Sequence, residues 1–387
     1  MHKTNGAIVA MNRRKGLTPP CGSFCVRIQT ILQWRDIVTY LMPRSMDAAF
    51  AALGDGGATV VAGGTDWFPA MGDRLPTLTV LDITALPGFR GIIRQNGMIR
   101  IGAATTWTDL IAATLPAAFN GLKAAAREVG SVQIQNAATI AGNLCNASPA
   151  ADGVPPLLTL DARVELVSVK GRRELPLDQF ILGPRRTALQ PGELLAAVLV
   201  PDPAASSHSA FLKAGARRYM VISIASAAAV LGLEGGHVTS ARVAVGACSA
   251  VAIRLAGLEY ALAGCPVAAI PAVTAEHLSG LAPLSDLRGS ADYRLQIAAV
   301  LVSRVLAMAV GQAEGHGAGP PEVPEIPRNP QPLSHGREAR YGSAGAPLSC
   351  LTGGAAVVRL WSGHPVQHSE RRLPNPVAVQ HGGGQNG

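Results

Sequence analysis

Aromatic and charged residues are scarce in this sequence. Of its 387 residues, 4% are aromatic and 15% are charged, whereas 48% are hydrophobic and 43 residues are glycine. A chain of this length has room for two or three domains with buried cores. Because small apolar residues are abundant and aromatics are few, an α/β or α+β protein is favoured over an aromatic-rich sandwich.

Several motifs that identify common function classes are missing. No G-x-G-x-x-G follows a strand pattern, and neither G-x-x-x-x-G-K-[ST] nor G-x-S-x-G occurs. This argues against a Rossmann site, a P-loop and a nucleophile elbow. The six cysteines, at positions 21, 25, 145, 248, 265 and 350, form no C-x-x-C pair. The spacing predicts neither zinc nor an iron–sulfur cluster in this chain, and it favours reduced thiols in a cytoplasmic protein.

Long apolar runs and a basic stripe are also missing. The net charge of +8 comes largely from arginines and lysines gathered near the two ends, so no nucleic-acid partner is expected. No apolar run is recognised as long enough for a membrane span. Gly, Thr and two Pro follow "MNRRK" where an export signal would be apolar.

Regular patterns begin near Tyr40 and end near residue 313. Before residue 155 the patterns predict short strands and helices: helices over residues 45–53, 107–115 and 117–130, and strands over 77–84 and 97–106. Thr106 is expected to cap the second helix and Gly130 to end the third. A hairpin follows, turning at residues 170–173. After it the patterns predict a strand over 193–201, two or three antiparallel strands over 209–248, and two helices.

The two ends of the chain lack such patterns. Residues 1–38 are irregular, and residues 314–387 are rich in Pro and Gly, so the latter are expected to be disordered or non-native. An early start codon and a frameshifted or read-through end would explain both segments.

Two glycine-containing loops offer the clearest chemistry. They are "VVAGGTDW" and "TIAGNLCNASPAAD", and the second has no evident helix or strand pattern. A diphosphate needs backbone N–H groups at close range, which glycine permits. An ordinary turn also explains Gly-Gly after a strand, but fourteen irregular residues within a domain favour a functional loop. Lys213, Arg217 and Arg218 form either a solvated strand end or a positive potential beside a cofactor that becomes anionic on reduction.

The sequence resembles the FAD-binding medium subunit of molybdenum hydroxylases, the xanthine dehydrogenase and carbon monoxide dehydrogenase family. The resemblance runs from about Tyr40 to Val310 and includes "AGGTDW", "LDITALPGFRGI", "VGSVQIQNAATIAGNLCNASPAAD" and "KAGARRYMVISIAS". It implies an α+β fold: a two-part α/β FAD-binding module of the PCMH or vanillyl-alcohol-oxidase type over residues 39–206, and a smaller α+β domain over 207–313. The chain departs from the family pattern at Gln135, Ala137, Ala141 and Pro184.

The resemblance also implies a site. The first pyrophosphate loop would be Val60, Val61, Ala62, Gly63, Gly64, Thr65, Asp66 and Trp67. The second would be Thr139, Ile140, Ala141, Gly142 and Asn143. Asp152 would hold the ribityl chain, and Val129, Leu195 and Lys213 would line the flavin. No residue is expected to be catalytic or to bind a metal.

The implied activity is electron transfer. A large subunit with a molybdenum cofactor and a small subunit with two-iron two-sulfur clusters would be the partners. The FAD would pass electrons to NAD or another acceptor. Two alternatives remain: a self-contained flavin oxidase, which needs its own substrate domain, and a flavin-free docking scaffold, which would purify colourless.

Overall fold

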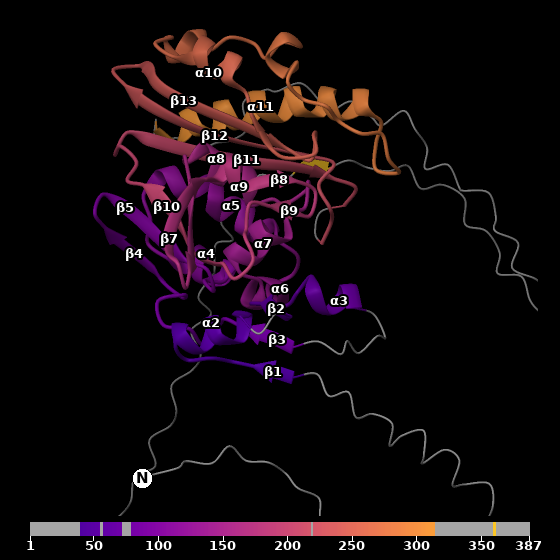
Figure 1. Cartoon of the computed structure of the whole chain (residues 1–387). Coiled ribbons are helices and arrows are strands. Elements are labelled where there is room, and N and C mark those ends of the chain that lie inside the picture. Colours follow the sequence, from indigo (N-terminus) through magenta and orange to yellow (C-terminus); the bar gives the residue numbers. More distant parts are fainter. Residues whose placement is uncertain (1–38, 55–56, 72–78, 218–219, 314–358, 361–387) are drawn as a thin grey trace, which may run out of the picture.

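The chain folds as three layers that follow one another in sequence. The computed structural model describes residues 39–54, 57–71, 79–217 and 220–313, and the backbone of residues 359–360. Figure 1 shows the N-terminal layer at the bottom, a larger middle layer, and the C-terminal sheet and helices at the top. Helices and separate sheets in this order confirm the α+β class. Residues 1–38 and the rest of 314–387, for which we expected irregular or non-native sequence, lie outside the described residues.

The first layer is a small parallel sheet. Its strands are β1 (Thr39–Leu41), β2 (Ala58–Val61) and β3 (Thr79–Asp82), in the order β1-β3-β2, and its helices are α2 (Met46–Gly54) and α3 (Trp67–Met71). Val61 pairs with Asp82, so β2 and β3 end side by side. The loop after β2 therefore leaves the carboxyl edge of a parallel sheet, which is where α/β proteins bind ligands.

The middle layer is an antiparallel sheet with helices packed on one face. The strands run in the order β4-β5-β10-β6-β7. Every residue of the central strand β10 except Pro201 is buried. The strands are β4 (Ile92–Gln95), β5 (Met98–Gly102), β6 (Arg163–Ser168), β7 (Gly171–Pro176) and β10 (Leu194–Pro201), with a two-stranded sheet of β8 (Ile181–Gly183) and β9 (Arg186–Thr187). The helices are α4 (Trp107–Ala112), η1 (Ala117–Phe119), α5 (Asn120–Glu128), α6 (Val132–Ala137), α7 (Ile140–Asn146), α8 (Val154–Thr159) and α9 (Leu177–Phe180).

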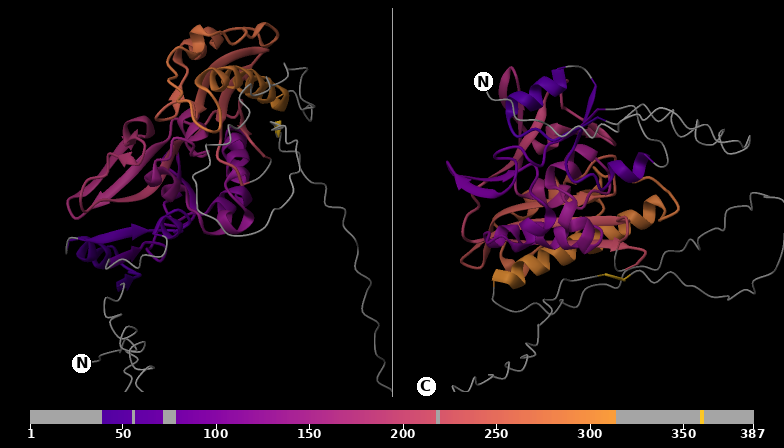
Figure 2. Two further views of the ribbon diagram at one scale, coloured as in Figure 1. Left: turned by 90° about the vertical axis from the view of Figure 1, so that its right-hand side faces the viewer. Right: turned by 90° about the horizontal axis from the view of Figure 1, so that it is seen from below.

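The third layer is an antiparallel sheet with helices on both faces. Its order is β14-β13-β12-β11-β15, the last strand being the residue pair Arg359–Leu360 beside the end of β11. Helix α11 packs on β11 and β12, while α5 and α8 of the middle layer pack on the same sheet; both views in Figure 2 show α11 along this sheet. The elements are β11 (Ser207–Gly215), β12 (Ala225–Glu234), β13 (His237–Gly246), β14 (Ile253–Arg254), α10 (Ala256–Leu262), η2 (Val267–Ala269), η3 (Glu276–Leu278) and α11 (Ala291–Ala313).

Small residues let β12 be covered on both faces. Successive side chains of a strand point to opposite faces. Ala228 packs with Phe211 and with Ala125 of α5, whereas Ala227 and Ala229 belong to the core that includes α11. Strand β12 is therefore the wall shared by the middle layer and the C-terminal layer.

Three sequence expectations need correction. The segment 139–152 is not irregular throughout, because Ile140–Asn146 forms helix α7. The hairpin turns at residues 168–171, and Arg172 and Arg173 lie in β7, where they form ion pairs with glutamates. Helix α11 is long and apolar enough to cross a membrane by length and composition. Its face with Ile297, Leu301 and Val305 is buried in the core of the third layer, as in a core helix.

Candidate functional site

The first predicted loop joins the end of β2 to the start of α3. Val60 and Val61 are the last residues of the strand, and Trp67 is the first of the helix. Gly64 has a positive φ of 67°, a conformation that glycine adopts without steric cost. The Phe68 N–H donates to the Gly64 carbonyl at 3.0 Å and starts the helical turns. The strand–turn–helix unit thus places residues 62–66 at the open end of the sheet.

Gly63 brings the two predicted loops together. A Cβ on Gly63 would lie 1.9 Å from the carbonyl oxygen of Ala137 and 2.9 Å from the Cα of Ala138. Real side chains do not approach this closely, so only glycine fits here. Ala137 ends α6 and Thr139 caps α7, and Figure 1 shows α6 directly beside β2. The first loop therefore packs on the chain just before the second.

The second predicted loop is the capped first turn of a helix. The Thr139 hydroxyl accepts a hydrogen bond from the Gly142 N–H at 3.0 Å, which is the usual N-cap bond. The Ile140 N–H donates to the Thr105 carbonyl at 3.0 Å, and Thr106 and Thr139 form an isolated β-bridge. These contacts fix the start of α7 against the end of the middle sheet.

Both loops keep polar groups that bind no other part of the chain that the structure describes. Within the described residues, the backbone N–H groups of Gly63, Gly64, Thr65 and Ala141 have no hydrogen-bond acceptor. The Asn143 side-chain oxygen is buried and also lacks a partner there. Unsatisfied buried polar groups are costly and point to a ligand or water. Free N–H groups suit a diphosphate, and an amide suits a polyol, so these residues fit an FAD.

Asp152 and Lys213 form a buried ion pair across two layers. The Lys213 ammonium lies 2.7 Å from one oxygen of Asp152, and both side chains are less than one tenth exposed. The other oxygen accepts from the Ser223 hydroxyl at 2.5 Å. Burial raises the pKa of Asp152, and Lys213 and Ser223 oppose that rise. Lys213 is therefore not a solvated strand end, as one of the two sequence interpretations held.

The remaining predicted residues differ in how directly they are connected to the Asp152–Lys213 pair. Lys213 also donates to the Glu128 carbonyl at 3.2 Å. Val129, which is half-buried, follows Glu128 directly in the chain and therefore lies next to this hydrogen bond. Leu195 is a buried residue of β10, opposite Leu166, and it belongs to the same hydrophobic core as Ile140 and Ala141. Arg217 is exposed and donates to the Met220 carbonyl, and Arg218 lies outside the described residues.

Sequence reasoning missed two supporting residues. Ser223 is a buried hydroxyl within the largely apolar run "MVISIAS", and a polar residue between two isoleucines was its signal. Gln135, noted as a departure, is buried and donates to the Arg127 carbonyl at 3.0 Å. That bond closes the turn between α5 and α6, which carries Val129.

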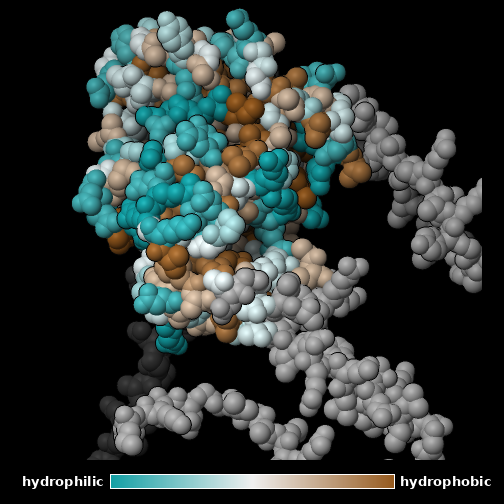
Figure 3. All heavy atoms as spheres, in the orientation of Figure 1, coloured by the Kyte–Doolittle hydropathy of each residue, from teal (hydrophilic) through white to brown (hydrophobic). Residues whose placement is uncertain are grey.

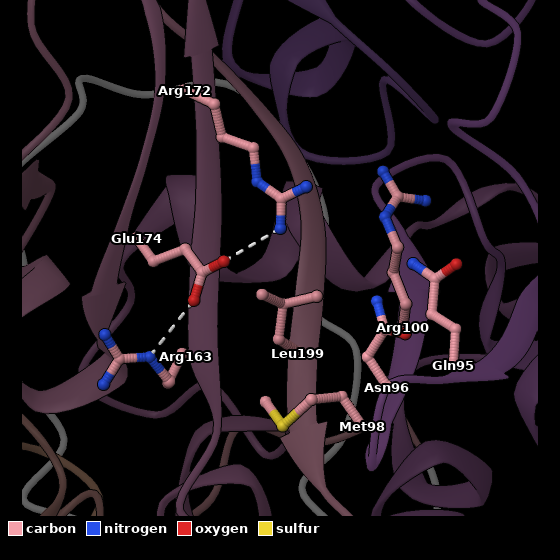
Figure 4. A pocket seen from close by; sticks show the side chains of 8 residues that line it. All are labelled: Gln95, Asn96, Met98, Arg100, Arg163, Arg172, Glu174 and Leu199. Carbon is pink, nitrogen blue, oxygen red and sulfur yellow. Dashed lines mark hydrogen bonds and ion pairs between the residues drawn. The ribbon is translucent and has the colours of Figure 1, made fainter.

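A depression on the outer face of the middle sheet is separate from these residues. It has a volume of about 380 Å³, and among the residues that line it Figure 4 shows Arg172 and Arg163 directed at Glu174. Glu165 and Glu174 stand directly opposite one another on β6 and β7. Like charges in that register repel, and Arg172, 2.8 Å from Glu174, offsets the repulsion. The charges here are therefore explained by the sheet itself.

Comparisons with known proteins agree with this geometry. Residues 35–203 match a model described as the FAD binding domain in molybdopterin dehydrogenase, and residues 210–309 match the CO dehydrogenase flavoprotein C-terminal domain. The chain is 33% identical to the xanthine dehydrogenase FAD-binding subunit of Escherichia coli O157:H7 over 293 residues, which are 72% of this chain and 98% of that protein. It is 31% identical to the carbon monoxide dehydrogenase medium chain of Hydrogenophaga pseudoflava, covering 69% of this chain and 95% of that one.

Solved structures give the same result. A carbon monoxide dehydrogenase structure from Hydrogenophaga pseudoflava matches with a TM-score of 0.65 at 31% identity, covering 71% of this chain and 98% of that chain. A quinoline 2-oxidoreductase from Pseudomonas putida 86 matches with a TM-score of 0.63 at 28% identity, covering 72% and 98%. This chain therefore belongs to the family of FAD-binding subunits of xanthine and carbon monoxide dehydrogenases, oxidoreductase subunits whose cofactor is FAD.

Proposed function

We propose that this chain is the electron-transfer subunit of a molybdenum-containing hydroxylase or dehydrogenase. It would take electrons from a small two-iron two-sulfur subunit, after a large molybdenum-cofactor subunit has oxidised the substrate, and would pass them to NAD or another acceptor. FAD supplies the redox chemistry because it accepts and donates electrons. The protein's share is to bind the cofactor, orient it and set its electrostatic surroundings.

One observation carries the assignment of the site. Gly63 packs on the carbonyl of Ala137, so the free N–H groups of Gly63, Gly64 and Thr65 lie beside the capped turn that carries Ala141 and Asn143. Two such rows of donors, facing one cofactor, would hold its diphosphate. We propose that Val60–Trp67 and Thr139–Asn143 are these two rows.

Lys213 would act on the flavin end of the site. Its ammonium is buried beside Asp152 and reaches the carbonyl before Val129. A positive charge in a poorly solvated site favours an anionic ligand beside it. We propose that Asp152 holds the ribityl chain and that Val129, Leu195 and Lys213 border the flavin, with Leu195 acting from the core of β10.

Two further assignments complete the proposal. We divide the chain into an FAD-binding domain over residues 39–206 and a C-terminal domain over 207–313, a division supported by the boundary between the two matched domains. We place the protein in the cytoplasm, supported by Cys145, Cys248 and Cys265, which are all unpaired. A self-contained oxidase is less well supported, because the relatives matched over nearly their whole length are named as subunits or chains of dehydrogenases.

The test is the assembled complex carrying Gly142→Val. A Cβ at Gly142 meets only the Thr139 hydroxyl, at 3.0 Å, and is otherwise in open space, so valine should fold and obstruct the cofactor. We expect full molybdenum and iron content, loss of bound FAD from the absorbance spectrum, and loss of substrate-driven reduction of NAD or of an artificial acceptor. Substrate should still reduce the iron–sulfur clusters.

Gly257→Val is the matched control, because Gly257 is likewise a helical glycine, a Cβ there meets nothing within 4 Å, and it lies in α10, away from both loops. Normal FAD content and normal acceptor reduction in the Gly142→Val complex would overturn the loop assignment. A complex that purifies without molybdenum or iron in the unmodified form would overturn the proposed partners.

A further inference from the structure

A buried carboxylate stands at the open edge of the first sheet. Asp82 is the last residue of β3, is 5% exposed, and pairs with Val61 at the end of β2. No arginine or lysine forms an ion pair with Asp82 in the part of the chain that the structure describes. A buried charge without a cation must be held by hydrogen bonds, so its donors show what this carboxylate organises.

Three donors converge on Asp82. One carboxylate oxygen accepts from the Thr84 backbone N–H at 2.8 Å and from the Thr84 hydroxyl at 2.6 Å. The other accepts from the phenol of Tyr40 on β1. Bonds to an ionised acceptor are roughly twice as strong as neutral ones. The carboxylate thus ties the end of β3 to β1 and fixes the turn that follows.

The residues that follow Asp82 also hold the loop after β2. Ile83, between Asp82 and Thr84, donates its N–H to the Val61 carbonyl at 3.0 Å. Val61 is followed directly by Ala62 and Gly63, and Gly63 has no space to move toward Ala137. A shift of the Val61 carbonyl would therefore move the free N–H groups of Gly63 and Gly64.

We propose that Asp82 is a positioning residue for FAD binding, which acts through Thr84, Ile83 and Val61 to hold the loop after β2 in its binding conformation. Tyr40 supports it from the neighbouring strand. The inference rests on the assignment of Val60–Trp67 to the FAD site. It assigns no contact between Asp82 and the cofactor.

The phenol of Tyr40 gives a direct signal for this network. The hydrogen bond to Asp82, with burial and the nearby negative charge, raises the pKa of Tyr40 from 10.0 to about 12. A raised pKa means that the bond is fully present below pH 10 and is lost as pH rises through about 12. Burial also raises the pKa of Tyr293, so absorbance titration should show a late-ionising fraction that Tyr40→Phe reduces, that Asp82→Asn shifts in part to lower pH, and that Tyr293 retains in both variants.

The deciding experiment compares Thr84→Val with Thr84→Ser in the full chain. Thr84 is exposed, and valine keeps its shape but loses the hydroxyl donor, whereas serine keeps both donors. We expect the FAD dissociation constant to rise about fivefold in Thr84→Val and in Tyr40→Phe, and more in Asp82→Asn. Thr84→Ser and the surface control Asp47→Asn should match the unmodified chain.

Each outcome separates the role of Asp82 from the loop assignment. All measurements are made where circular dichroism shows the chain to be folded, so lost stability alone leaves the dissociation constant unchanged. Unchanged constants in both Thr84→Val and Tyr40→Phe would overturn the proposal, whether or not Asp82→Asn folds. Gly142→Val, which tests the site formed by the two loops, must weaken FAD binding in the same series. If it does not, the assignment of the loop fails, and the proposal for Asp82 fails with it.

Discussion

The Lys213–Asp152 pair shows how far single residues of the site could be foreseen. Both were named from the family resemblance, because their separation of 61 residues gives no local signal. The resemblance gave each a role toward the cofactor but not their contact with each other. The structure adds that each is the other's principal charge partner in a buried setting, with Ser223 completing the set.

Lys213→Ala should therefore lower stability as well as change the flavin. Removing one member of a buried pair leaves the other uncompensated, which costs about 3–5 kcal/mol in typical cases. We expect this loss in denaturant unfolding, and a lower flavin reduction potential in the folded fraction, because a positive charge is lost. Combining Lys213→Met with Asp152→Asn should recover much of the stability. Equal stability of Lys213→Ala and the unmodified chain would show that the pair is not buried as described.

Helix α7 shows what sequence patterns miss at the scale of elements. Its Gly, Asn and Cys residues are poor helix formers, and the sequence offered no apolar periodicity. The helix is held by its surroundings instead: Thr139 caps it, and the Thr105 carbonyl binds its first N–H. By contrast, the start of α4 and its cap were predicted correctly, because Thr106 and Asp109 form a local capping box within four residues, although the helix ends at Ala112 and not at residue 115.

Thr139→Ala should test this cap. Loss of an N-cap hydroxyl costs about 1 kcal/mol, and here it also frees the Gly142 N–H and loosens the turn that carries Ala141. We expect a small fall in melting temperature and a severalfold weaker FAD affinity, measured by flavin titration. Thr139→Ser should behave as the unmodified chain. Ser45→Ala, which removes the corresponding bond at α2, should lower stability without changing FAD affinity.

At the scale of the whole molecule, one aspartate joins the middle and C-terminal layers. Asp161 lies between α8 and β6 and accepts from Arg242 of β13 and from Arg254 of β14, the latter at 2.5 Å. Arg254 is also held by Glu259 of α10. Hydrophobic patterns in the sequence predicted strands in each layer. They could not predict these ion pairs, because contacts between layers leave no periodic pattern in the sequence.

Asp161→Asn should loosen the contact between the layers. Asparagine tolerates the positive φ of 50° at this position, so the change removes charge without backbone strain. Pairs this exposed contribute little individually, and we expect a loss of about 1 kcal/mol in denaturant unfolding, with faster proteolysis near residues 203–207. Asp178→Asn, an exposed acid on α9 with no ion pair among the described residues, is the control. Identical behaviour of the two variants would contradict the role of Asp161.

The alanine-rich strand β12 limits which substitutions this protein can accept. Because Ala228 touches α5 on one side and its neighbours touch the α11 core on the other, any larger residue there must displace a helix. Displacing α5 would carry Glu128 with it, and the Glu128 carbonyl is bound to Lys213. A substitution in the C-terminal layer would thus reach the proposed FAD site through a single peptide group, so the two layers are expected to accept substitutions together rather than independently.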